Sequence, residues 1–242
     1  MTVMSKNELI KRYVLFVISL FFAAIGVAFT KHGELGVSPI SSVANVMSCK
    51  YTVLSLGTWL IIWNCVLIVG QIVLLRNNFK LVQLLQVPLS VLFGWFTDFG
   101  MWLVSSIPVN SYPSRLAMVL IGIVILGFGI SLSVIANVIM NSGEAFVKAL
   151  SDITHKEFGN IKIAFDVSCV ILALLLSLLF FDMKIVGTRE GTIISALLTG
   201  VVVKFFTKRF RKPLEKILDD KVPGDGSPKV PGDGSPAPTS AV

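Results

Sequence analysis

The sequence predicts an all-α integral membrane protein with six transmembrane helices, arranged as two inverted three-helix repeats that each carry a short extra helix. Composition is the first observation behind this prediction: 54% of the 242 residues are hydrophobic, 14% are charged, and the mean hydropathy is +0.83. A soluble domain carries about 25% charged residues. Too few charges are present to cover a water-exposed surface, so lipid is the expected surroundings of most of it.

Six mainly apolar stretches are the second observation, because each comes close to the roughly 20 residues that a spanning helix needs. Two shorter and more polar segments, 36–50 and 141–156, separate the first span from the second and the fourth from the fifth. They are too short to span, and we expect re-entrant or interfacial helices there. The six predicted spans cover residues 13–31, 56–75, 81–104, 116–138, 158–181 and 186–206.

Lysine and arginine lie mainly in alternate loops, which predicts the orientation in the membrane. The basic residues before the first span, between the second and third spans, between the fourth and fifth, and after the sixth would all lie inside. The protein is therefore expected in the plasma membrane, with both chain ends in the cytoplasm. This orientation explains the net charge of +7 better than nucleic-acid binding does, since no basic face interleaved with aromatic residues appears.

The chain divides into a cytoplasmic N-terminus, two membrane repeats, a basic cytoplasmic segment and a tail. The tail contains KVPGDGSP twice, and its proline, glycine and serine content predicts a disordered repeat tail or a vector-derived extension. In residue numbers these parts are 1–12, 13–104, 116–206, 207–220 and 221–242.

Matching landmarks recur in the two halves, offset by about 103 residues, and this is the third observation. Weak internal symmetry of this kind is typical of transporters, and three spans per half require the halves to be inverted. Residues 13–104 are then expected to superpose on 116–206 about a two-fold axis in the membrane plane; chance similarity of apolar helices is the alternative. The matched residues are Gly26 with Gly129, Gly57 with Gly159, Asn64 with Asp166, and Gly94 with Gly200.

Asp166 is the strongest candidate for a binding site, because a carboxylate inside a span costs at least about 2.5–3.5 kcal/mol on insertion scales. It is expected to bind a substrate or a proton; a structural hydrogen bond is the alternative. The helical rise places Asp166 and Asn64 roughly 12 Å into their spans from opposite faces. Both therefore approach the midplane of a hydrocarbon core about 30 Å thick, although Asn64 can equally serve to pair backbone groups.

Both short segments begin with residues typical of helix starts. Ser38 is a candidate N-cap and Pro39 suits the first helical position. Asn141 precedes the second segment, and Glu144 lies in its first turn. If the segments are re-entrant, their first amides would point a positive dipole at an anionic group. A surface amphipathic helix and, for Glu144, simple capping are the alternatives.

The starts of the third and sixth spans add further polar candidates. Gln83, Gln86 and Pro88 interrupt the third span, and Pro88 leaves a carbonyl that needs a partner. Arg189 can hold a carboxylate or phosphate with two hydrogen bonds, or it can pair with Glu190. One polar cavity between the halves is predicted to take a small-molecule substrate, lined by Asp166, Asn64, Glu144, Arg189, Gln86, Ser38, Gln83 and Asn141.

Motifs of common enzymes are missing from the sequence. It contains no Walker A loop, nucleophile elbow, HExxH or dinucleotide-binding fingerprint. His32 and His155 stand alone in loops, without the clustered ligands of a metal site. We therefore expect no enzymatic activity, no catalytic residue, no cofactor and no metal.

Several ordered runs carry a resemblance to a known family. They include LGVSPISSVANVMS and FKLVQLLQVPLSVLFGWFTD in the first half, and GEAFVKAL, FGNIKIAFDVS and GTREGTIISALLTG in the second. Together they resemble the YczE/YitT-type group of bacterial membrane proteins over roughly residues 10–210. The resemblance implies a small bacterial plasma-membrane protein of unassigned or transport function, and it implies no substrate.

The leading hypothesis is a small-molecule carrier that works by alternating access around a midplane site. A channel, the substrate-binding subunit of an energised uptake complex, and a membrane scaffold or regulator remain as alternatives. The lipid bilayer and a small molecule are the expected partners. The substrate, the direction of movement, the coupling ion and a homo-oligomeric state all stay open.

Overall fold

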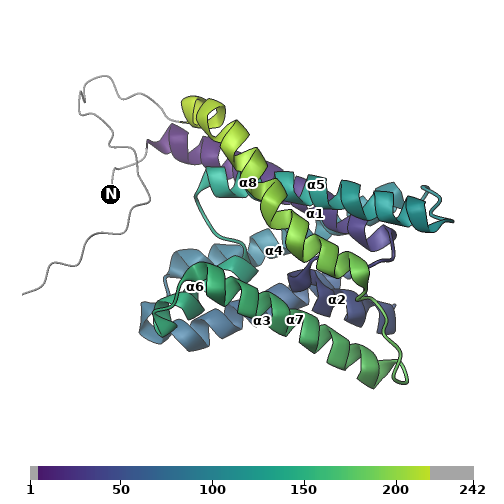
Figure 1. The fold of residues 1–242 in the computed structure, drawn as a ribbon. Coiled ribbons are helices and arrows are strands. Elements are labelled where there is room, and N and C mark those ends of the chain that lie inside the picture. Colours follow the sequence, from purple (N-terminus) through teal and green to yellow (C-terminus); the bar gives the residue numbers. More distant parts are fainter. Residues whose placement is uncertain (1–4, 219–242) are drawn as a thin grey trace, which may run out of the picture.

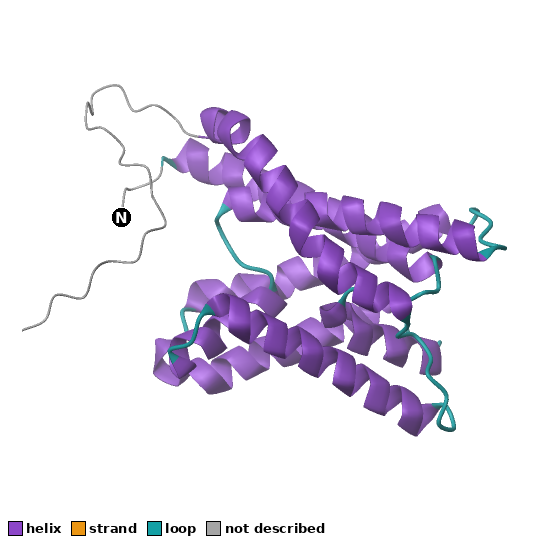
Figure 2. Ribbon diagram, viewed as in Figure 1, coloured by secondary structure: helices purple, strands orange, loops and turns teal. Residues whose placement is uncertain are grey.

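The computed structural model describes residues 5–218, and all the regular structure in this range is helical (Figure 2). Six helices are long and apolar enough to cross a membrane, which confirms the predicted number of candidate spans. In chain order the elements are α1 (Lys6–His32), α2 (Pro39–Lys50), α3 (Leu56–Leu75), η1 (Arg76–Asn78), η2 (Leu81–Leu85), α4 (Gln86–Val104), α5 (Tyr112–Ala136), α6 (Ser142–Thr154), α7 (Phe158–Phe180) and α8 (Glu190–Leu218).

The helices form two groups (Figure 1). In one group α1 and α5 pack together at the centre, α4 packs on α1, and α8 packs on α5. In the other group the short helices α2 and α6 each pack against both α3 and α7. The α3–α4 and α2–α8 contacts join the groups. Each short helix therefore lies between one long helix from each half of the chain.

Glycines bring α1 and α5 into close contact. A Cβ atom added at Gly26 would meet the backbone of Leu126, and one added at Gly129 would meet the backbone of Ala23. Small residues at a helix interface let two backbones approach closely, as is common in membrane proteins. In the most apolar 18-residue stretch of each helix, 56% of the residues of α1 and 61% of those of α5 are buried, against 17% of those of α7.

Helix boundaries follow the local sequence. The hydroxyl of Ser55 accepts a hydrogen bond from the N–H of Thr58 at 3.1 Å and so caps α3. Ser111 caps α5 in the same way, from the N–H of Ser114 at 3.4 Å. At the other end α5 stops at Asn137, which takes the left-handed conformation with φ 49°.

Four predicted spans differ from the structure at their starts, and two of these begin earlier than expected: α1 at Lys6 rather than 13, and α5 at Tyr112 rather than 116. Residues 81–85 are a 3₁₀ helix, and the α-helix begins only at Gln86, so that Pro88 falls in the first turn of α4, where its missing N–H costs little. The sixth helix begins at Glu190 rather than 186 and continues to Leu218. The predicted tail, 221–242, lies outside the described residues.

Both short helices are packed inside the bundle. Six consecutive residues of α2, from Ser41 to Val46, are buried. In α6 six residues between Ser142 and Ser151 are buried, while Lys148 is exposed. This burial rules out the alternative of a surface amphipathic helix for α2.

Candidate functional site

Each half of the bundle encloses one of two cavities. The first-half cavity has a volume of about 110 Å³ and lies between α1, α3 and α4. The second-half cavity has a volume of about 650 Å³ and lies between α5, α7 and α8. They meet at a shared set of residues, which are Ser38, Ile40, Leu126, Ile130, Met140 and Glu144.

The first turns of α2 and α6 face each other where the cavities meet. A Cβ atom added at Gly143 would lie 3.0 Å from Cδ1 of Ile40. Ser38 occupies the N-cap position of α2, as the sequence predicts, and Asn141 occupies that of α6, but neither side chain caps its helix. The Ser38 hydroxyl instead donates to the Ser41 hydroxyl at 3.0 Å. Both helix starts therefore turn backbone N–H groups that lack a side-chain cap toward the cavities.

A polar network closes one wall of the first-half cavity. The side-chain amides of Gln71 and Gln86 bond to each other at 3.1 and 3.2 Å, and the Gln71 amide also donates to the carbonyl of Ser142. The hydroxyls of Ser90 and Ser142 are 3.2 Å apart. These bonds tie α3, α4 and the start of α6 together, which keeps this cavity small.

Charged residues line the second-half cavity. Nζ of Lys162 lies 2.6 and 2.8 Å from the two carboxylate oxygens of Asp166, one helical turn further along α7. On the facing helix α8, the hydroxyls of Ser195 and Thr199 are 3.3 Å apart. This cavity therefore has polar groups on α7 and α8, and further polar residues such as Ser133, Asn137 and Glu144 lie among the apolar side chains of the remaining wall.

Glu144 is the acidic residue that lines both cavities. Its carboxylate makes no hydrogen bond or ion pair to any residue within 5–218. Burial raises the pKa of the Glu144 carboxyl; Lys162 acts against this rise and Asp166 adds to it. An unpaired, partly buried carboxylate with a raised pKa can exchange a proton with whatever enters the cavities.

At the far end of the first half, Asp98 joins α4 to the start of α3. Its carboxylate accepts a hydrogen bond from the Ser55 hydroxyl at 2.6 Å and another from the N–H of Gly57 at 2.8 Å. The α3 and α4 backbones touch at this level, since a Cβ atom added at Gly94 would lie 2.7 Å from the carbonyl oxygen of Gly57. Asp98, which the sequence did not single out, thus holds two helices together.

Six of the eight predicted site residues line the cavities, but they do not share one cavity as predicted. Asn64, Gln86 and Asn141 line the first-half cavity, Asp166 lines the second, and Ser38 and Glu144 line both. Whether any of them binds a substrate stays a prediction.

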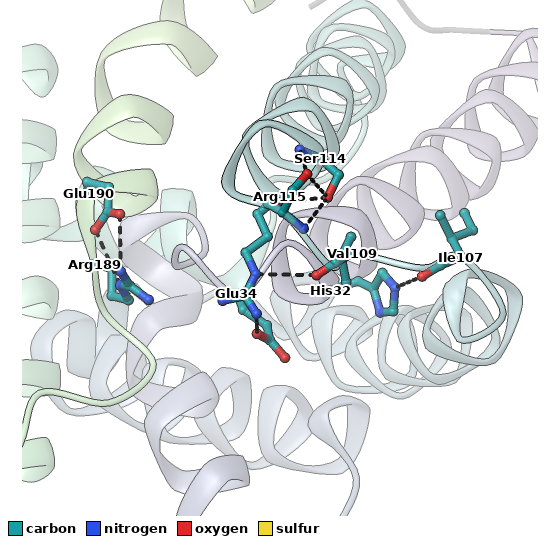
Figure 3. A network of polar contacts seen from close by, with 9 residues as sticks. His32, Glu34, Ile107, Val109, Ser114, Arg115, Arg189 and Glu190 are labelled. Atoms are coloured by element: carbon teal, nitrogen blue, oxygen red, sulfur yellow. Dashed lines mark hydrogen bonds and ion pairs between the residues drawn. The ribbon is translucent and has the colours of Figure 1, made fainter.

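Arg189 and Gln83 line neither cavity, and this corrects the prediction that they would join the other residues. Arg189 pairs with its neighbour Glu190 at 3.3 Å, beside the Arg115–Glu34 pair where the loops meet (Figure 3). It lies in the loop before α8, because the helix starts four residues later than expected. Gln83 lies in the 3₁₀ helix η2, where its side chain accepts a hydrogen bond from the N–H of Lys80.

Lys162 lines the second-half cavity but is not among the residues that the sequence predicts for the site. Asp166 is predicted as a lone charge within a span, whereas in the structure the lysine one turn earlier neutralises it. A lysine four residues from an aspartate is a recognisable helical ion pair, so this signal is present in the sequence.

The cavities hold no recognisable metal site. Within residues 5–218, no three His, Cys, Asp or Glu side chains gather closely enough to hold a metal ion. The volume of the second-half cavity falls within the roughly 300–1,000 Å³ typical of small-molecule pockets.

Sequence comparisons identify a family, but the descriptions of its members name no activity. Residues 10–208 match the model of a family described as "Family of unknown function (DUF6198)". The chain is also similar to the "Uncharacterized membrane protein YczE" of Bacillus subtilis (strain 168), with 25% identity over 202 residues that cover 83% of this chain and 87% of that protein. These matches confirm the resemblance to a YczE-type membrane family. No solved structure matches this chain.

Proposed function

This chain belongs to the family of unknown function DUF6198, and we propose that it is a small-molecule carrier that works by alternating access. The observation that carries this proposal is the unequal size of two cavities in corresponding parts of the two halves, about 110 Å³ against 650 Å³. A carrier built from inverted repeats needs one half closed while the other is open.

Contacts between the halves support the inverted repeat. Ala23 and Leu126 are 103 residues apart, as are Gly26 and Gly129, and the contact of Gly26 with Leu126 is the counterpart of that between Ala23 and Gly129. Of these two contacts, the one with the higher residue number on α1 has the lower residue number on α5, so the two helices are antiparallel. A two-fold axis that exchanges two antiparallel helices is perpendicular to them, which in a membrane means parallel to its plane.

A second pair of contacts obeys the same relation. Val43 on α2 and Ala173 on α7 belong to one apolar cluster. The position that corresponds to Val43 in the second half is Phe146 on α6, and the position that corresponds to Ala173 in the first half is Gly70 on α3. These two residues also meet, since a Cβ atom added at Gly70 would lie 2.7 Å from the Phe146 ring. This agreement favours the inverted repeat over chance similarity between apolar helices.

The cavities correspond as well. Leu60 on α3 lines the first-half cavity, and Ile163 on α7, 103 residues further on, lines the second. Leu126 and Ile130, the counterparts of Ala23 and Val27, line both cavities. In this proposal the two spaces are equivalent sites in different states. An exchange of their shapes would move the accessible volume from one half of the bundle to the other.

Glycines define which half is closed. Gly57 and Gly94 bring α3 and α4 into backbone contact, whereas a Cβ atom added at Gly159 or Gly200 would meet nothing within 4 Å. Figure 1 shows α7 and α8 leaving a common linker and diverging. With both chain ends in the cytoplasm, as the loop charges favour, this arrangement is closed to the outside and open to the inside.

A thermal-shift screen against a metabolite library, followed by uptake measurements, tests the carrier function. A ligand that binds the folded protein at 100 times its Kd stabilises it by about 2.7 kcal/mol, and each stabilising compound is then offered to proteoliposomes that contain the protein. We expect at least one compound both to stabilise and to be taken up. A ligand that stabilises but never crosses would contradict the carrier proposal and favour a scaffold or a binding subunit; co-purification with an ATPase module would favour the latter.

A further inference from the structure

Charge is unbalanced in the two cavities. Among the described residues that line them, the charged side chains are Glu144, Lys162 and Asp166. Lys162 and Asp166 neutralise each other through two short contacts. An ionised Glu144 therefore leaves one negative charge without a partner, and a buried unpaired charge is unfavourable.

Glu144 can avoid this cost in two ways. It can hold a proton, which its raised pKa favours, or it can pair with a cation from the solution. The two are mutually exclusive at one carboxylate. The partial positive charge at the start of α6 favours the ionised form, but the fractional charge of a helix end does not replace a cationic partner.

Within residues 5–218 no basic side chain is paired with Glu144, and Lys148, one turn further along α6, pairs with Asp152 at 2.6 Å. Lys162 on α7 is the cation that acts on Glu144, and it is already engaged by Asp166. Among the other neighbours of α6, helix α3 carries no acidic or basic residue and contributes only the thiol of Cys65, while the one charge of α2, Lys50, lies at the far end of that helix.

The surrounding side chains indicate what kind of cation fits. Phe16, Trp63 and Phe93 line the first-half cavity together with Glu144, and Phe158 lines the second. Aromatic faces attract ammonium groups, especially where water is excluded. The remaining walls are mostly aliphatic, so an apolar body attached to the positive group would also be accommodated.

We propose that Glu144 binds, in alternation, a proton and the positive group of an amphiphilic organic monocation, an amine or a quaternary ammonium with an apolar body. This proposal rests on the carrier function proposed above and names its substrate class. Binding of the cation to the protonated site releases the proton to solution and leaves a carboxylate–cation pair. One proton exchanges for one positive charge, so transport by this route is an electroneutral exchange.

Proton release tests the proposal directly. The intact purified protein, in weakly buffered detergent solution with a pH indicator, is titrated with benzyltrimethylammonium, which has no proton of its own to lose. Wild type is expected to release up to one proton per bound cation and to bind the cation more tightly as pH rises. Two matched probes serve as controls: the neutral isostere neopentylbenzene and the anion phenylacetate, neither of which should release a proton.

Variants distinguish Glu144 from the other carboxylates. Glu144→Gln is expected to abolish proton release and to weaken cation binding at least tenfold, whereas Glu144→Asp keeps the charge and should retain both. Glu190→Gln, which alters the exposed pair with Arg189, should behave as wild type. If Glu144→Gln does not fold, the pH dependence of cation binding by wild type still decides the question.

Three outcomes would overturn the proposal: cation binding that does not change with pH, no stabilisation of wild type by the cation, or equal binding by Glu144→Gln. Stronger binding of phenylacetate would assign the cavities to anions instead. Uptake separates this proposal from the carrier function. Proton-releasing binding without uptake contradicts the carrier, whereas uptake that does not depend on the Glu144 charge contradicts only the substrate class.

Discussion

The α3–α4 pair and the α7–α8 pair are built from corresponding parts of the sequence, yet only the first is closed. Gly57 and Gly94 allow backbone contact between α3 and α4, and Asp98 adds two hydrogen bonds from α4 to the start of α3. Gly159 and Gly200 face open space, and a cavity of about 650 Å³ separates their helices. Glycines at corresponding positions thus lie in a helix contact in the α3–α4 pair and beside open space in the α7–α8 pair.

The largest expected effect comes from filling a glycine in the closed pair. Gly57→Val would drive a branched side chain into the Gly94 carbonyl and the Asp98 carboxylate, and overpacking of this kind costs about 1–3 kcal/mol or more. Gly159→Val is the matched control, and it should change stability little because nothing lies within 4 Å. Thermal unfolding in detergent measures both. Equal losses in the two variants would contradict the difference between the pairs.

A smaller loss is expected when Asp98 is removed. Asp98→Ala deletes the acceptor for the Ser55 hydroxyl and the Gly57 N–H, and because the site is partly exposed we expect a cost of roughly 1–2 kcal/mol. The same change should open the α3–α4 contact, so that a cysteine introduced at Ile61 reacts faster with a water-soluble maleimide. Unchanged labelling of that cysteine would mean that Asp98 does not hold the pair closed.

Gly200→Ala should have the smallest effect of the three changes, and it should raise stability rather than lower it. Alanine is favoured over glycine inside a helix by about 0.8–1.0 kcal/mol, and the added methyl group has room in this state. Transport should nevertheless slow, since closure of α7 on α8 would need that space. A variant that is more stable and transports at the wild-type rate would show that the α7–α8 pair never closes at Gly200.

Much of the fold could be predicted because it depends on local signals. Apolar length gave the six spans, and the Ser38–Pro39 sequence located the start of α2. The inverted relation between the halves stays a prediction, based on matching positions such as Gly26 and Gly129. Helix boundaries in polar loops were less certain, and a shift of four residues moved Arg189 from an expected cavity to the surface.

The unequal cavities could not be predicted from the sequence. The sequence predicts one polar cavity between the halves, and nothing in the residues around Gly94 or Gly200 indicates which helix pair is closed. The partner of Asp166 was available in the sequence, because Lys162 precedes it by four residues. The unpaired state of Glu144 was not, since it depends on which side chains the fold brings near it.

Disulfide trapping in a background without Cys49, Cys65 and Cys169 tests alternating access most directly. Ile61→Cys with Gly94→Cys joins the closed pair, where Cγ1 of Ile61 lies 2.6 Å from the position of a Cβ atom at Gly94. Ile163→Cys with Gly200→Cys is the equivalent pair across the second-half cavity. Alternating access predicts that each cysteine pair forms a disulfide under oxidation and that the second pair does so more slowly. It also predicts that no single molecule carries both disulfides. Failure of the second pair to link under any condition, or molecules with both disulfides, would contradict it.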